Sequence, residues 1–234
     1  MSPLFSVDVL DAGYVHAIES WGSDQRIIEA ARMSTDKRFQ GWDTDGRLLA
    51  YLYRNKHMTP FEMAGIVLEV KAPIFVFREW HRHRTQSYNE LSARYVPLPD
   101  ENYIPTFERV SQVATTNKQA QGVTPLGNVN EIKRWLSRLR KAYASAQQVY
   151  EDGLALGVPK ELARLPVPVG RYSRMRASAN LRNWLQFLTL RTAENAQYEI
   201  RVYAKAVQGI LTNIFPRTME LFLEAESKSD GVGR

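Results

Sequence analysis

The densest group of side chains able to do chemistry lies at residues 82–95, which read RHRTQSYNELSARY. Its cations are all arginines, Arg82, Arg84 and Arg94, whose planar guanidinium groups suit phosphate or carboxylate ligands. A solvated charged loop is the alternative interpretation. Because serine, asparagine and aromatic residues are interleaved with the charges, the segment favours a binding site.

The second half of this segment alternates in polarity. If residues 90–95 form a strand, Glu90, Ser92 and Arg94 point to one face of it. The remaining residues of the strand, Leu91, Ala93 and Tyr95, then point to the other. We therefore expect a strand with one apolar face on the core and one face toward a ligand.

A further arginine, Arg191, occupies an unusual position. Leu181, Trp184 and Leu188 form an apolar helical stripe whose next positions are Arg191 and Asn195. A guanidinium on an apolar face needs an anionic partner, because an unpaired buried charge is very costly. That partner is either a bound ligand or a carboxylate from elsewhere in the chain, and the sequence leaves both open.

Other chemistries have less support. The chain contains no cysteine, which excludes disulfides, thiolate metal sites and a cysteine nucleophile. Of its histidines, His81 and His83 are spaced as a metal pair on a strand, but no further ligand cluster accompanies them. We therefore expect no metal site.

Composition narrows the class of protein. With 234 residues and 44% hydrophobic side chains, the chain can bury a core. Its net charge of +6 favours anionic partners such as nucleotides, an acidic cofactor or nucleic acid. It contains no GxGxxG dinucleotide loop and no apolar run that could span a bilayer. Because residues 1–20 lack a basic leader, we expect a cytoplasmic protein without a membrane partner.

Periodicity and capping residues predict the elements that must position these side chains. The fold class they indicate is α+β, a twisted, largely antiparallel sheet flanked by long helices, in one domain over residues 1–234. A polar excursion over 101–130 is expected to be mobile unless something pins it. The expected strands cover 7–9, 14–18, 65–70 and 171–178; the expected helices cover 24–33 capped by Ser23, 74–80 after Pro73, 130–153 capped by Asn130, 180–215 with a possible break near Arg191, and 217–224.

The arginine-rich segment resembles the R-H-R-x-x-S-x-N-E-x-S-x-R motif of the flavin-dependent thymidylate synthases, and it matches every fixed position. Three further stretches resemble the family in the same order. They are ARMS at 31–34, HMTPFE at 57–62, and NLR at 180–182 followed by Leu190 and Arg191. The resemblance runs from about residue 24 to about residue 224.

The resemblance implies an FAD site, a homotetramer and shared active sites. The residues that it implies for FAD are Ser34, Thr59, Glu62, Arg82, His83, Arg84, Glu90, Asn180, Leu181, Arg182, Gln186 and Asn195. Gln186 and Asn195 depart from the family pattern, in which an asparagine and a histidine are expected. Met63 and Glu79 also replace a frequent histidine and a frequent glutamine.

The implied reaction is the reductive methylation of dUMP to dTMP, with methylenetetrahydrofolate as one-carbon donor and NADPH-reduced FAD as hydride donor. The residues implied for dUMP are Glu79, Trp80, His81, Arg82, Glu90, Leu91, Ser92, Ala93, Arg94, Arg164 and Arg191. We expect Arg191 to stabilise negative charge at N3 and O4 of uracil, since no cysteine can attack the ring. Ser92 is expected to orient the nucleotide, and a nucleophilic Ser92 is the rival role.

Two other classes remain as alternatives. A nucleic-acid-binding protein would explain the basic charge, with Tyr88 and Tyr95 as stacking partners. A flavoprotein without enzymatic activity would bind FAD and form no dTMP. The motif disfavours both, so we expect small-molecule partners and no nucleic acid.

Overall fold

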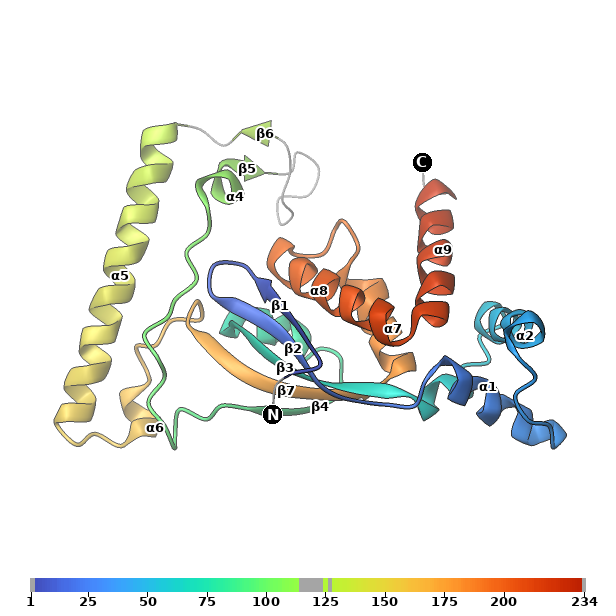
Figure 1. Ribbon diagram of the computed structural model, residues 1–234. Coiled ribbons are helices and arrows are strands. Elements are labelled where there is room, and N and C mark those ends of the chain that lie inside the picture. The colour runs from blue at the N-terminus through green and yellow to red at the C-terminus, as the bar shows by residue number, and fades with distance from the viewer. Residues whose placement is uncertain (1–2, 114–123, 126–127, 233–234) are drawn as a thin grey trace.

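The computed structural model describes residues 3–113, 124–125 and 128–232. Within these residues a five-stranded sheet forms, with every neighbouring pair antiparallel. Its order is β1 (Phe5–Val9), β2 (Gly13–Trp21), β3 (Gly65–Pro73), β7 (Tyr172–Asn180) and β4 (Ser87–Glu90). The expected α+β fold with an antiparallel sheet is therefore confirmed (Figure 1).

Helices cover one face of this sheet and extend beyond its ends (Figure 1). The α-helices are α1 (Asp24–Arg32), α2 (Trp42–Arg54), α3 (Ile74–Trp80), α4 (Phe107–Ser111), α5 (Val129–Ala155), α6 (Lys160–Ala163), α7 (Leu181–Arg191), α8 (Tyr198–Ile214) and α9 (Pro216–Val232). Short 3-10 turns cover Met33–Thr35 and Thr59–Met63, and a small hairpin pairs β5 (Gln112–Val113) with β6 (Thr124–Pro125).

The core lies between the sheet and α7 and α8. Alternation along β3 buries Ile66 and Leu68 completely, while Glu69 points to the opposite, half-exposed face. Trp184 of α7 is fully buried and donates from Nε1 to the main-chain oxygen of Ile66 at 3.2 Å. Tyr203 of α8 is also fully buried and donates to the main-chain oxygen of Lys71 at 2.7 Å. These contacts fix α7, and with it Arg191, against the sheet.

The strand order places the motif strand at an edge of the sheet. Because β7 lies between β3 and β4, Ser87 pairs with Ser178 and Glu90 pairs with Met175. The same β7 leads directly into α7, whose N-cap is Asn180. Segments about a hundred residues apart in the chain are thus brought together at one edge.

The expected strand over residues 90–95 is wrong. The strand ends at Glu90, and the Leu91 amide makes a last bond to the main-chain oxygen of Arg174 at 2.8 Å. The chain then turns, because the amides of Tyr95 and Val96 both donate to the main-chain oxygen of Ser92 at 3.0 and 3.2 Å. Tyr95 is consequently 73% exposed instead of facing the core.

Several other boundaries also differ from the expected ones. Asn128, not Asn130, caps α5, since its side chain accepts from the Asn130 amide at 2.8 Å. The helix runs past Gly153 to Ala155, and α9 runs beyond residue 224. The break after Arg191 is confirmed. Although α5 has 27 residues, no helix in the described ranges is apolar enough to cross a membrane.

The start of the polar excursion is pinned to β7. Arg171 is fully buried and donates to the side chains of Asn102 and Gln147 and to the main-chain oxygen of Pro99, at 2.7–3.1 Å. The Tyr103 amide donates to the main-chain oxygen of Gly170 at 2.9 Å. Residues 114–123 and 126–127 of the expected excursion lie outside the described residues.

Candidate functional site

The first half of the motif is a tight turn between α3 and β4. The His83 amide donates to the main-chain oxygen of Trp80 at 3.0 Å, and the Gln86 amide to that of His83 at 3.3 Å. The Tyr88 hydroxyl lies 2.7 Å from the main-chain oxygen of His83. Trp80 is buried and donates from Nε1 to Oε1 of Gln86 at 3.1 Å, which fastens the turn to the core.

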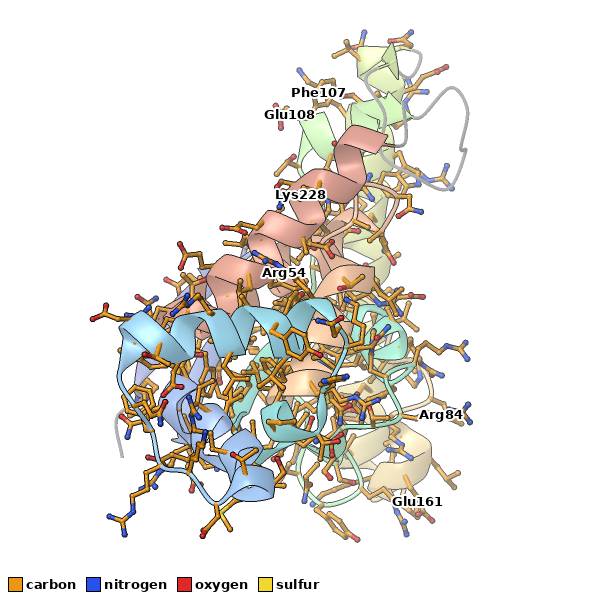
Figure 2. All side chains as sticks on the ribbon, turned by 90° about the vertical axis from the view of Figure 1, so that its right-hand side faces the viewer. Arg54, Arg84, Phe107, Glu108, Glu161 and Lys228 are labelled. Atoms are coloured by element: carbon orange, nitrogen blue, oxygen red, sulfur yellow. The ribbon has the colours of Figure 1, made fainter. Side chains whose placement is uncertain are left out.

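This turn separates its three basic side chains. His83 points inward and is 8% exposed. Arg82 and Arg84 are exposed, and Figure 2 shows the Arg84 side chain projecting away from the body of the molecule. Two exposed guanidinium groups on one turn can bind a doubly charged group such as a pyrophosphate.

Arg191 closes the inner side of the turn. Its Nε donates to Nε2 of His83 at 2.9 Å, and its Nη1 to Oε2 of Glu79 at 2.8 Å. Its Nη2 donates to the main-chain oxygen of Glu79 at 2.9 Å. The Arg191 side chain is 16% exposed and that of Glu79 is 40% exposed. Arg191, which the sequence analysis placed on an apolar helix face, therefore has a carboxylate partner within the chain, Glu79, at the margin of the core.

These contacts also set the charge of His83. Its Nε2 accepts the Arg191 proton, so the ring is unprotonated at that atom. Burial, and to a smaller extent the positive charge of Arg191, together lower the pKa of His83 to about 4, although Glu79 partly opposes the change. His83 is therefore neutral at pH 7 and fixes the plane of the Arg191 guanidinium without competing for its charge.

The second half of the motif lines a separate pocket with a volume of about 470 Å³. Five of the residues expected to bind the nucleotide lie here, and the other five lining residues, Ser173 among them, were not expected at a site. The lining residues are Ile74, Glu90, Leu91, Ser92, Ala93, Leu98, Arg164, Leu165, Val167 and Ser173. We call this the Ser92 pocket. None of Glu79, His83 and Arg191 lines it.

Ser92 and Arg94 have local roles in this structure. The Ser92 hydroxyl accepts from the Arg94 amide at 3.3 Å, which supports the turn after β4. Arg94 does not line the Ser92 pocket; it pairs with Oε2 of Glu161 at 3.1 Å, with both side chains more than half exposed. An ion pair this exposed is weak, so Arg94 is free to take another anion at little cost.

Two residues expected to contact the nucleotide have side chains that pack inward. Trp80 is fully buried and packs against Phe187 and Trp184. His81 lies 3.1 Å from the sulfur of Met175 through Nε2. Leu181, expected to contact the cofactor, is also fully buried, and its amide donates to the main-chain oxygen of Ala64 at 2.7 Å. These side chains therefore pack against the core and anchor the segments that carry the exposed site residues.

The remaining residues expected at the cofactor are mostly exposed. Arg182 pairs with Oε1 of Glu62 at 2.5 Å, which links α7 to the 3-10 turn that begins at Thr59. Asn180 caps α7 by accepting from the Asn183 amide at 3.0 Å. The Asn183 side chain donates to the main-chain oxygen of Thr85 at 3.0 Å, so the start of α7 is tied to the arginine turn.

Three other expected cofactor residues make no such link. Ser34 lies in an exposed 3-10 turn, where its hydroxyl donates to the main-chain oxygen of Ala31 at 3.0 Å. Gln186 and Asn195 are exposed on and after α7. Among the described residues, no group of three or more His, Cys, Asp or Glu side chains could hold a metal ion.

Ser173 is the residue that the sequence analysis missed. It is 3% exposed and lies on the same face of β7 as Met175 and Ala177, which are buried on the helix-covered side. A serine on an otherwise apolar strand face is a readable signal, because buried hydroxyls need a partner.

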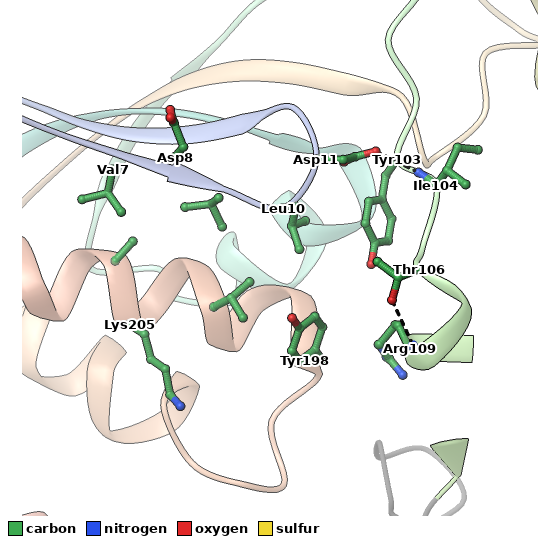
Figure 3. A pocket seen from close by; sticks show the side chains of 13 residues that line it. Val7, Asp8, Leu10, Asp11, Tyr103, Ile104, Thr106, Arg109, Tyr198 and Lys205 are labelled. Carbon is green, nitrogen blue, oxygen red and sulfur yellow. Dashed lines mark hydrogen bonds between the residues drawn. The ribbon is translucent and has the colours of Figure 1, made fainter. Parts of the chain in front are cut away.

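A larger pocket of about 540 Å³ lies between the β1–β2 hairpin, α8 and residues 103–109 (Figure 3). None of the expected site residues lines it. Its Arg109 pairs with the buried Glu199 at 2.8 Å, and its Asp11 accepts from the Tyr172 hydroxyl and from the Ile104 amide. These polar groups are used in holding the 103–109 segment against α8 and β7.

Comparison with known proteins assigns the chain to a family. Residues 17–217 match the family described as Thymidylate synthase complementing protein. A flavin-dependent thymidylate synthase of Anaplasma marginale is 39% identical over 226 residues, covering 97% of this chain and 77% of that protein. The enzyme of that name from Thermotoga neapolitana is 36% identical over 224 residues, covering 96% and 97%.

A solved structure agrees with both the sequence and the fold. The UMP/dUMP methylase PolB of Streptomyces cacaoi, bound with 5-Br dUMP, superposes with a TM-score of 0.82 at 30% identity, covering 93% of this chain and 97% of that one. The chain therefore belongs to the thymidylate synthase complementing protein family, whose members include the flavin-dependent thymidylate synthases.

Proposed function

We propose that this chain methylates dUMP to dTMP, using FAD, methylenetetrahydrofolate and NADPH. The relatives are named flavin-dependent thymidylate synthases, and PolB is described as a UMP/dUMP methylase. The absence of cysteine from all 234 residues requires a route without a cysteine nucleophile. The observation that carries the proposal is the Arg191 guanidinium, oriented by a neutral histidine at the margin of the core.

Arg191 is the residue that we propose to act on the uracil ring. A guanidinium beside N3 and O4 stabilises the negative charge that develops there when a hydride adds to the ring. His83 keeps the guanidinium in one plane through Nε. Glu79 is 40% exposed, so its ion pair with Nη1 is weak, and the uracil edge can replace the carboxylate there. The bond from Nη2 to the Glu79 main-chain oxygen persists through the exchange.

The Ser92 pocket is the proposed site of the sugar and phosphate. Arg164 lines it, and within the described residues its guanidinium has no carboxylate partner. Arg94 lies next to the pocket in an easily exchanged ion pair. We assign Ser92 an orienting role, because its hydroxyl already accepts from the Arg94 amide and supports the turn. Glu90, which lines the same pocket, is suited to accept from a sugar hydroxyl.

The residues near the arginine turn fit the charge of FAD. Arg82, Arg84 and Arg182 present three exposed guanidinium groups on adjoining segments, which suits a pyrophosphate in a chain without a glycine-rich dinucleotide loop. Glu62 and Thr59 lie at the Arg182 end of this surface. When bound, FAD supplies the redox chemistry, and the protein supplies binding and orientation.

We further propose that the chain forms a homotetramer whose active sites are shared between subunits. In one chain, Arg191 and the Ser92 pocket are two separate groups of residues. In addition, α5 exposes Trp135 and Val149 by 48% and 56%, which is costly for a helix that faces only water. A second copy of the chain could bury both.

Reconstitution tests the proposed function. Purified protein should be yellow, and after its flavin has been removed it should form dTMP only when dUMP, methylenetetrahydrofolate, NADPH and FAD are all supplied. Omitting each component in turn identifies those that are required. A flavin-bound protein that forms no dTMP would point to a flavoprotein without this activity. A colourless protein that binds random oligonucleotides with a steep salt dependence would point to nucleic acid binding.

A further inference from the structure

The Ser173 hydroxyl is buried without a hydrogen-bond partner. Ser173 is 3% exposed, and its Oγ makes no hydrogen bond with any described residue. Its strand neighbour across the β3–β7 ladder is Ala72, which offers no polar side chain. Leaving a buried hydroxyl unbonded costs free energy, whereas an alanine of similar size would avoid that cost. The hydroxyl therefore indicates a partner that the isolated chain does not provide.

The position of Ser173 restricts the chemistry of that partner. Ser173 lines the Ser92 pocket, where apolar side chains such as Ile74 and Val167 form much of the wall. The pocket volume of about 470 Å³ suits a small ligand instead of a single water molecule. Arg164 adds a cation that is unpaired within the described residues. A partner that accepts from a buried hydroxyl beside a free guanidinium is an oxyanion.

We propose that Ser173 is a substrate-binding residue whose hydroxyl donates to a phosphate oxygen of the bound nucleoside monophosphate, together with Arg164. The inference rests on the proposed function, which supplies the nucleotide, and it assigns to β7 a contact that the motif does not contain. Because β7 is the second strand from the sheet edge, its backbone holds Ser173 more firmly than the turn holds Ser92. Ser173 would thus fix the depth at which the phosphate sits.

Replacing Ser173 with alanine separates this role from a structural one. In the absence of ligand, S173A should unfold at the same temperature as the wild type or a higher one, because an unsatisfied polar group is removed. Its Kd for dUMP should rise about tenfold or more, since a hydrogen bond to a charged group is lost. Ser178 is a matched control: it lies on the opposite face of the same strand, and S178A should bind dUMP like the wild type.

Deoxyuridine, which lacks the phosphate, identifies the group that Ser173 contacts. The proposal expects S173A and the wild type to bind deoxyuridine with Kd values within about twofold, so the loss is confined to dUMP. An equal loss for both ligands would overturn it, since the contact would then be to the sugar or base. Unchanged dUMP affinity would overturn it as well. If S173A does not fold, Ser173→Cys preserves the volume with a much weaker donor and carries the same comparison.

Because dUMP binding is measured directly, the test of Ser173 is separate from the test of dTMP formation. A wild type that binds dUMP but forms no dTMP contradicts the proposed reaction and leaves the Ser173 comparison intact. A wild type that forms dTMP, with S173A binding dUMP equally well, contradicts the Ser173 inference alone. A wild type that does not bind dUMP contradicts both.

Discussion

Arg191 donates from Nη1 to the carboxylate of Glu79 at 2.8 Å and from Nη2 to the main-chain oxygen of the same residue at 2.9 Å. One residue at the end of α3 thus holds both terminal nitrogens of a guanidinium at the end of α7. The carboxylate bond is exchangeable because the Glu79 side chain is 40% exposed, while the main-chain bond is fixed by the fold. This arrangement keeps an arginine oriented while leaving one of its nitrogens available to a ligand.

Arg191→Lys should retain the fold and FAD but lose most dTMP formation. Lysine keeps the charge, yet it cannot bond to His83 and Glu79 at once in one plane and still face the uracil edge. We expect turnover to fall at least about 100-fold, comparable to the loss of one donor that stabilises a developing oxyanion. The measurements are dTMP formation, flavin absorbance and the unfolding temperature.

The control for this variant is Arg201→Lys. Arg201 lies on α8, donates to the main-chain oxygen of Glu194, and is not among the residues assigned to the site. The Arg201→Lys variant should keep wild-type turnover. If Arg191→Lys unfolds or loses FAD while Arg201→Lys does not, Arg191 is a structural ion-pair partner, and its assignment to uracil is wrong.

His83 should make the folded protein lose stability as the pH falls from about 6.5 to about 4. The pKa of His83 is about 4 in the folded chain, against about 6.5 when unfolded. Across this window the unfolded state binds the proton first, so the stability that His83 contributes is complete above pH 6.5 and decreases below it. The decrease from this one residue is at most about 1.4 kcal/mol per pH unit.

His83→Gln isolates this contribution. Glutamine offers an acceptor to Arg191 but does not titrate. Denaturant unfolding of both proteins at several pH values should give a shallower slope for H83Q in this window. Equal slopes would mean that His83 titrates near its ordinary pKa, and that its bond to Arg191 does not persist in solution.

Local patterns in the sequence were enough to predict most elements. Ser23 and Pro73 define their helix starts through local chemistry, and the structure has both as expected. The strand over 90–95 failed because alternation is a weak signal when a serine can bond its own backbone. The Ser92 hydroxyl accepts from the Arg94 amide, its main-chain oxygen accepts from the Tyr95 and Val96 amides, and these bonds replace the ladder.

Long-range partners could not be predicted in the same way. The apolar stripe on α7 required a partner for Arg191, but nothing in the sequence singled out Glu79 and His83, more than a hundred residues away. Their meeting depends on the packing of α7 against the sheet. Likewise, the sequence gives no reason for β7 to lie between β3 and β4, which is what brings Ser173 to the Ser92 pocket.

Arg171→Met should destabilise the protein by about 2–4 kcal/mol, because it removes the hydrogen bonds that a fully buried guanidinium makes to three residues. Arg171 is fully buried and holds Pro99, Asn102 and Gln147 against β7. Methionine fills much of the same space but donates no hydrogen bond. Denaturant unfolding measures the loss, and limited proteolysis should show earlier cleavage within residues 99–113.

Arg176→Met is the matched control, on β7, the strand that begins directly after Arg171. Its side chain is 54% exposed and pairs with Glu69 at 3.3 Å, so the substitution should cost less than about 1 kcal/mol. Equal losses for the two variants would show that the buried network of Arg171 contributes no more than a surface pair does.

The shared active site predicts complementation between two inactive variants. Arg94 and Arg191 both belong to the proposed site, yet in one chain Arg94 pairs with Glu161 while Arg191 pairs with Glu79. We expect Arg94→Ala and Arg191→Ala each to be inactive alone, because each damages every site. In mixed oligomers, a site that takes Arg191 from the first variant and Arg94 from the second is intact.

Co-expression of the two variants, or joint unfolding and refolding, allows the chains to mix. With random mixing and one donor of each kind per site, about a quarter of the sites should recover activity. Mixing the folded proteins without subunit exchange should recover nothing, which is the internal control. Different affinity tags on the two variants allow the hetero-oligomers to be purified and verified. If verified hetero-oligomers stay inactive, one chain supplies both arginines, and the site does not lie between subunits.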